Sequence, residues 1–127
     1  MKESKAVIWP QERGYHKAVQ IYAENSPFLV FGSSMDEMHG EILARFLEEH
    51  NITYTCVEIP GSVSTVTPCL EGDKYKVVGM GRPKVIPENK YMSAHGTSTD
   101  YIIRMNKEHL EKIQQLYPDW TILMYNI

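Results

Sequence analysis

Polar and apolar residues alternate along parts of this chain with the period of a β-strand, and elsewhere apolar residues recur with the period of a helix. Residues 16–23 (HKAVQIYA) alternate polar and apolar side chains, which predicts a half-buried strand. Residues 28–31 (FLVF) form a continuous apolar run, which is typical of a central strand. The other apolar runs predict strands or extended segments at residues 5–9, 52–59, 63–69, 74–80, 91–95 and 121–125.

Two segments carry the helical period. Ser34 and Glu37 have the spacing of a capping box, so we expect the first helix to begin near Ser34 and to end at Asn51. Asn106 is a candidate N-cap for a second helix over residues 107–116. The buried stripe of the first helix is formed by residues at helical spacing, namely Ile42, Leu43, Phe46 and Leu47.

The order of these elements predicts the fold class. Several strands and two helices on one sheet indicate an α+β fold. A chain of 127 residues can bury one core of moderate size, so we expect residues 1–127 to form a single domain.

Composition narrows the class of protein. The net charge is -3 and the basic residues do not cluster, which argues against nucleic acid as a partner. There is no run of 18 apolar residues and no apolar signal-peptide region at the start, so we expect no membrane span and a cytoplasmic location. Cys56 and Cys69 form no C-x-x-C pair and are expected to be reduced, structural thiols.

His39 is the first residue whose position suggests chemistry. We expect it about one turn inside the first helix, where the positive end of the helix dipole favours a neutral imidazole. Gly40 removes a neighbouring side chain, at a cost to the helix of about 1 kcal/mol relative to alanine, so close access to the ring is a plausible compensation. A hydrogen-bonded histidine at the edge of the buried stripe is the plainer interpretation of the same pattern.

Three further features are candidates for binding an anion. Residues 96–100 (GTSTD) form a small, hydroxyl-rich loop, which can present hydroxyl and N–H groups to an anion but is also ordinary turn chemistry. Arg82 follows the glycines of residues 79–82 (GMGR) and could bind an oxyanion or lie on a solvated edge. Lys17, early in its strand, is the weakest of the three.

No metal or nucleotide motif accompanies these residues. The five histidines form none of the usual metal-ligand spacings, and the two cysteines add none. The chain contains neither a P-loop nor a dinucleotide-binding glycine motif, so we expect neither a metal nor a cofactor.

Taken in order, these segments resemble the protein phosphohistidine phosphatase family, also called the Janus/Ocnus family. Residues 14–19 (GYHKAV) resemble the family's first core strand with its lysine, and residues 32–42 resemble its GYKWAEYHADI stretch. Residues 79–82 resemble its GGGR stretch, and residues 95–101 (HGTSTDY) resemble its YGYSMAY loop. Residues 111–120 resemble its EKI…KYPDY stretch.

The resemblance covers roughly residues 14–126 and implies a mixed β-sheet flanked by two α-helices. Residues 52–75 are longer than the family norm and are expected to form an extra hairpin. The family implies hydrolysis of phosphohistidine without a metal or another cofactor. By carry-over, His39 would be the general base that activates water, and the phosphate would be bound by Lys17, Arg82, Ser98, Thr99 and Asp100.

Two positions depart from the family pattern. Phe31 stands where the family has an arginine, so one phosphate-binding charge is lost, although an aromatic ring could offer a stacking surface instead. Asp100 stands where the family has an alanine, and a carboxylate there would repel a phosphate dianion unless it pairs with Arg82 or Arg104. Both departures bear on the substrate more than on the fold.

The sequence therefore favours a metal-independent phosphatase that acts on phosphohistidine, or on a related phosphoramidate or phosphate ester, in a phosphorylated protein or small molecule. One alternative is a non-catalytic pocket that binds a nucleotide or another phosphorylated small molecule. Another is a protein-interaction role, in which the extra hairpin at residues 52–75 serves as an oligomerisation edge.

Overall fold

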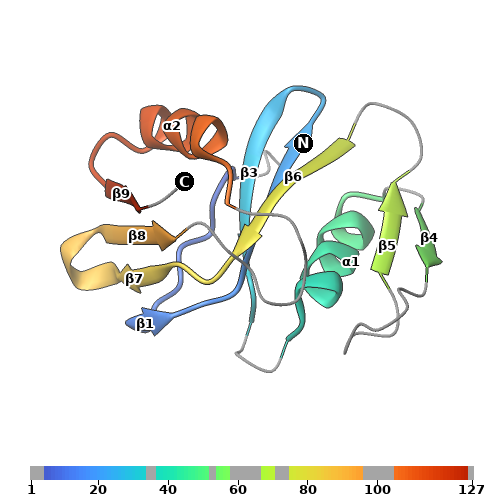
Figure 1. Ribbon diagram of the computed structural model, residues 1–127, viewed down its shortest axis with the longest axis horizontal. Helices are drawn as coiled ribbons and strands as arrows, with labels where there is room; N and C mark the ends of the chain where they lie inside the picture. The colour runs from blue at the N-terminus through green and yellow to red at the C-terminus, as the bar shows by residue number, and fades with distance from the viewer. Residues whose placement is uncertain are drawn as a thin grey trace.

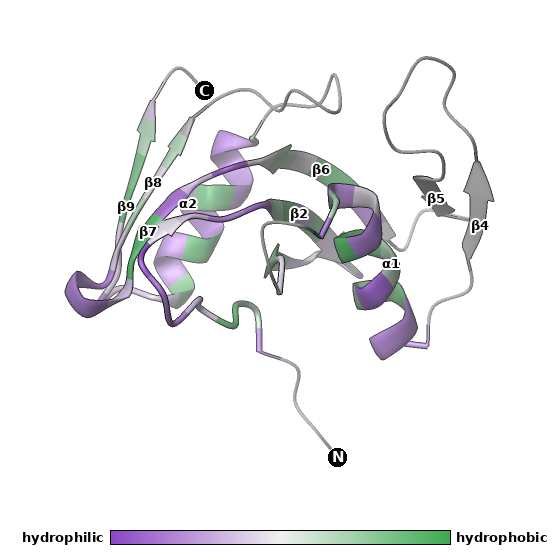
Figure 2. Cartoon of the chain, turned by 90° about the horizontal axis from the view of Figure 1, so that it is seen from below, coloured by the Kyte–Doolittle hydropathy of each residue, from purple (hydrophilic) through white to green (hydrophobic). Residues whose placement is uncertain are grey.

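A computed structural model describes residues 5–33, 37–51, 54–57, 67–70, 75–95 and 105–125 (Figure 1). Its strands form three sheets, and the described part contains two α-helices. In both views the three-stranded sheet lies between the helices (Figure 1, Figure 2). Neither helix is long and apolar enough to cross a membrane.

The three-stranded sheet is antiparallel, in the order β3 (Ser26–Phe31), β2 (Ala18–Ala23), β6 (Tyr75–Gly81). Strands β2 and β3 form a hairpin whose two turn residues, Glu24 and Asn25, have φ values of 50° and 72°. Two consecutive left-handed residues are what a tight two-residue hairpin requires, and asparagine tolerates this conformation better than most residues.

Each face of this sheet packs against a different helix, because successive side chains of β2 point to opposite sides. Val19 and Ile21 pack with α1 (His39–Glu49), on the stripe that the sequence predicts to be buried. On the other face, Ala18 packs in a second hydrophobic cluster, which includes Leu110 and Ile113 of α2 (Lys107–Leu116).

The four-stranded sheet also packs against α2, in the same hydrophobic cluster as Ala18. Its order is β1 (Gly14–Tyr15), β7 (Lys84–Ile86), β8 (Tyr91–His95), β9 (Thr121–Tyr125), and only the β8–β9 pair is parallel. A short 3-10 turn, η1 (Pro87–Asn89), joins β7 to β8. The chain before β1 closes this core, because Trp9 stacks on Trp120 with ring centroids 3.7 Å apart.

A separate two-stranded ribbon, β4 (Tyr54–Val57) and β5 (Thr67–Leu70), lies beside α1 (Figure 1). Both strands fall inside residues 52–75, where the sequence predicts an extra hairpin. The hairpin is therefore present and stands apart from the two larger sheets.

The α+β fold with two helices is confirmed, and α2 and β9 have the bounds that the sequence predicts. The strands of the expected single sheet are divided between a mixed and an antiparallel sheet. The expected start of the first helix is wrong. Met38 is the N-cap of α1, and the Glu41 side chain accepts a hydrogen bond from the Met38 N–H at 3.0 Å. The strand β7 carries only three residues, too few for a periodic signal in the sequence.

Candidate functional site

Lys17, His39 and the end of β6 meet at one end of the three-stranded sheet. Ala18, the first residue of β2, pairs with Gly81, the last residue of β6, so Lys17 and Arg82 flank this pair. His39 is the first residue of α1, and its ring reaches the same point. The structure thus brings together three candidates that are far apart in the sequence.

The His39 ring is held by the backbone of β6. It is completely buried, and its Nε2 lies 2.9 Å from the carbonyl oxygen of Gly81. A carbonyl oxygen can only accept, so Nε2 carries the hydrogen and donates it. In the neutral ring the lone pair therefore lies on Nδ1, which is the atom that could act as a base.

His39 occupies the first position of the helix, and the expected position one turn inside is wrong. Met38 is the N-cap, so the helix begins at His39, five residues after Ser34.

Lys17 is a buried cation beside the helix start. The residue is 7% exposed, and its Nζ lies 3.8 Å from the Met38 sulfur, a weak acceptor. Among the described residues, the Met38 sulfur is the hydrogen-bond partner of the Lys17 ammonium. A buried ammonium normally has a carboxylate, several oxygen acceptors or a bound anion as its partner, so Lys17 is suited to holding an anion here.

Glu37, just before α1, forms an ion pair with Arg45 that the sequence reasoning missed. Arg45 Nε and Nη2 donate to the two carboxylate oxygens of Glu37 at 3.0 and 3.1 Å, and Nη2 also donates to the Phe31 carbonyl at 2.8 Å. Ser33 N–H donates to the same carboxylate at 2.7 Å. An acidic residue just before a helix with a basic residue in its second turn is the signal that could have indicated this pair.

Electrostatics agree with that geometry. Burial by itself would raise the pKa of Glu37, but the hydrogen bonds from Arg45 and Ser33 outweigh it and lower the pKa below its ordinary value. The pKa of Arg45 is raised, mainly by its hydrogen bond to Glu37. Both groups are therefore charged at neutral pH.

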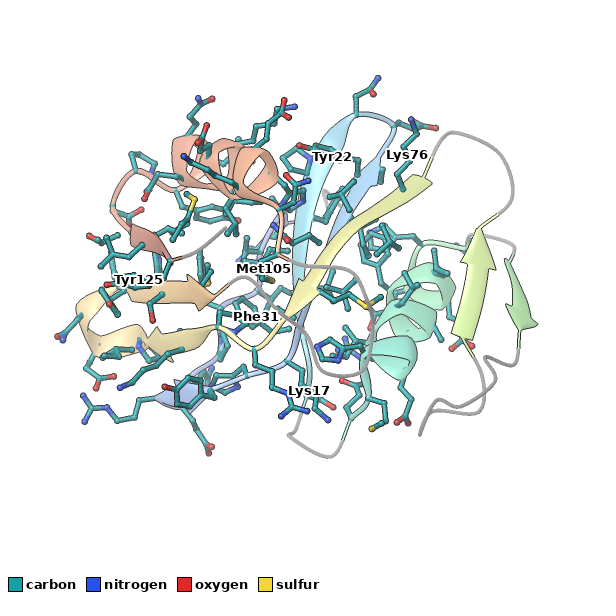
Figure 3. All side chains as sticks on the ribbon, in the orientation of Figure 1. Lys17, Tyr22, Phe31, Lys76, Met105 and Tyr125 are labelled. Atoms are coloured by element: carbon teal, nitrogen blue, oxygen red, sulfur yellow. The ribbon has the colours of Figure 1, made fainter. Side chains whose placement is uncertain are left out.

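The remaining predicted site residues differ in their placement. Arg82 is exposed and directly follows Gly81. Phe31 is buried on the opposite face of the sheet, in the cluster with Ala18, where its ring centroid is 5.9 Å from that of Trp9. Figure 3 labels both Lys17 and Phe31. Ser98, Thr99 and Asp100 lie outside the described residues.

A second buried histidine, His109, belongs to α2 and serves the core. Gln20 Nε2 donates to its Nδ1 at 3.1 Å, and its Nε2 donates to the Ile21 carbonyl at 3.1 Å. Burial lowers its pKa from 6.5 to about 4. Both ring nitrogens are therefore occupied within the protein, and this histidine is not placed to meet a substrate.

Over the described ranges, no group of three or more His, Cys, Asp or Glu side chains is arranged to hold a metal ion. No protein-family model matches the chain. A search of curated proteins also finds no match.

Proposed function

We propose that this protein is a phosphatase that hydrolyses phosphohistidine, or a related phosphoramidate or phosphate ester, with His39 as the general base. The observation that carries the proposal is the meeting of Lys17, His39 and the Gly81–Arg82 backbone at one end of the sheet. The four-segment resemblance to the phosphohistidine phosphatase family supports the same assignment.

The reaction follows from the roles of these residues. His39 Nδ1 takes a proton from a water molecule whose oxygen attacks the phosphorus. The P–N bond breaks as the P–O bond forms, and the departing imidazole takes up a proton from solvent, which balances the proton that His39 returns to solvent. The products are inorganic phosphate and histidine. Lys17 and Arg82 balance the negative charge of the phosphoryl oxygens, which is the main contribution a protein makes to this reaction. We place Ser98, Thr99 and Asp100 around the phosphate by the same resemblance.

Full burial of the His39 ring sets a requirement on this mechanism. A base must come within about 3 Å of the water that it deprotonates. Substrate binding must therefore open the cover over Nδ1 and admit one water molecule and the phosphoryl group.

The same burial favours a second function, a pocket that binds a phosphorylated small molecule without cleaving it. In that case His39 is a structural residue that ties α1 to β6, and Lys17 is the main anion-binding group.

The test is phosphate release from a phosphohistidine-containing peptide, without added metal and with a chelator present. The test variant is His39→Ala. The control variant is His50→Gln, because His50 lies at the opposite end of the same helix. We expect release by the wild type and by His50→Gln, and none by His39→Ala. Release by a folded His39→Ala protein would remove the base assignment, and no release by the wild type would favour the binding pocket.

A further inference from the structure

A small hollow lies at the opposite end of α1 from His39. It has a volume of about 230 Å³ and is lined by Ala23, Glu24, Ser26, Phe28 and His50. It forms where the β2–β3 turn meets the last residues of the helix, just beyond Tyr22, which Figure 3 labels.

His50 contributes a hydrogen-bond acceptor to this region. Its Nδ1 donates to the Phe46 carbonyl at 2.9 Å, so the lone pair of the neutral ring lies on Nε2. That Nε2 is buried and has no hydrogen-bond partner among the described residues. The ring cannot easily turn away, because it stacks on Phe46 at 4.1 Å and meets the Phe28 ring at 5.6 Å.

Several features of the lining of the hollow favour a cation. The C-terminus of a helix carries partial negative charge, and α1 has no basic residue in its last turn to offset it. Glu24 is the charged residue among those that line the hollow, and Ser26 adds a hydroxyl. The Phe28 ring contributes an aromatic surface, which also attracts cations.

We propose that this hollow binds an organic cation, an alkylammonium or alkylguanidinium group. The N–H groups of such a cation would donate to His50 Nε2, the Ser26 hydroxyl and the Glu24 carboxylate, and its alkyl carbons would contact Phe28. The volume is that of about eight water molecules, at roughly 30 Å³ each, and is smaller than pockets for drug-sized ligands. It therefore fits a short free amine or the end of one lysine or arginine side chain.

This site is separate from the proposed phosphatase site and does not depend on it. The hollow lies at the last residues of α1, whereas His39 is its first residue. Loss of one activity should leave the other unchanged.

The test is an NMR titration of the full chain, following the backbone amides of residues 23–26 and 50. The probes are n-propylguanidinium and its neutral analogue n-propylurea. A blocked Gly-Arg-Gly peptide and its citrulline analogue form a second pair. We expect saturable shifts at these amides at millimolar concentrations of either cation and none with the neutral analogues. A peptide that binds more tightly than the free cation would identify a protein side chain as the source, and the reverse would identify a free amine.

Two variants and one control complete the test. Glu24→Gln should weaken binding of the cation about fivefold, since a surface carboxylate–cation pair contributes on the order of 1 kcal/mol. His50→Phe keeps a ring against Phe46 but removes the acceptor, and it should weaken binding as well. Glu111→Gln on the exposed side of α2 is the control and should leave binding unchanged. Equal shifts with the neutral analogues, shifts at other residues, or unchanged binding by Glu24→Gln would overturn the proposal.

Discussion

The His39 imidazole donates through Nε2 to the Gly81 carbonyl oxygen at 2.9 Å, and this bond joins the first residue of α1 to the last residue of β6. One contact therefore fixes the tautomer of the candidate base and also anchors a helix to the sheet. Any substitution of His39 changes both, so activity and stability must be measured together.

His39→Ala should lower the free energy of unfolding by about 1 to 3 kcal/mol, because it leaves the Gly81 carbonyl without its donor and opens a small cavity. Urea unfolding followed by tryptophan fluorescence measures this. His39→Gln keeps an N–H donor on the side chain and should recover part of the loss. If His39→Ala is as stable as the wild type, the contact does not anchor the helix.

Arg82→Ala should weaken binding of inorganic phosphate about fivefold, because it removes one exposed cation next to the Gly81 backbone. Competitive inhibition by phosphate measures the effect, or calorimetry if the protein does not turn over. Arg13→Ala, a substitution of an arginine that pairs with Glu88, is the control and should change nothing. Unchanged inhibition by phosphate in Arg82→Ala would remove this residue from the site.

Phe31→Arg should destabilise the protein by about 3 kcal/mol or more. It would place a charge among aromatic rings, with Trp9 at 5.9 Å and His16 at 6.3 Å from the present ring. Phe31→Leu keeps an apolar side chain and should cost less. Thermal unfolding of the two variants gives the comparison. A stable Phe31→Arg protein with faster phosphohistidine hydrolysis would mean that an arginine can reach the Lys17 face, as the family pattern implies.

Glu37→Gln should lower the free energy of unfolding by about 1 to 2 kcal/mol, because Arg45 loses the nearer of its two carboxylate partners in a partly buried place. A double-mutant cycle with Arg45→Gln should give a favourable coupling energy between the two side chains. Glu111→Gln on α2 serves as the surface control. A coupling energy near zero would show that the pair does not hold the segment before α1.

Stability should fall as the pH falls from about 6.5 to about 4, because the pKa of His109 is lowered to about 4 by burial. The folded state binds fewer protons than the unfolded state in this window. The contribution of the neutral ring is therefore complete above pH 6.5 and is lost as the pH falls through 4. The full effect is on the order of 3 kcal/mol. His109→Phe should lack this part of the pH dependence when its unfolding is compared with the wild type at each pH, and an equal slope in both proteins would contradict the assignment.

Local patterns in the sequence were enough for α2 and β9. Asn106 accepts a hydrogen bond from the His109 N–H at 2.9 Å, as an N-cap does, and Leu110 and Ile113 face the core at helical spacing. The start of α1 was predicted wrongly because Ser34 and Glu37 imitate a capping box. The carboxylate of Glu37 instead binds Arg45, eight residues further along in α1, and accepts a hydrogen bond from the Ser33 N–H.

The candidate site likewise combines features that local sequence determines with features that only the folded structure determines. Periodicity, capping residues and turn residues determined the α+β class and both helices, since these depend on neighbours within a few positions. Lys17, His39 and Arg82 became candidates from their places in the sequence and from the family resemblance. Tertiary structure alone decided that Gly81 receives the His39 hydrogen bond, that Lys17 lies beside Met38, and that Phe31 points to the opposite face. These facts depend on the pairing of β2 with β6 and on the side of the sheet that each helix covers. Strand register and helix docking join residues 21 to 63 positions apart, and no local pattern specifies such contacts.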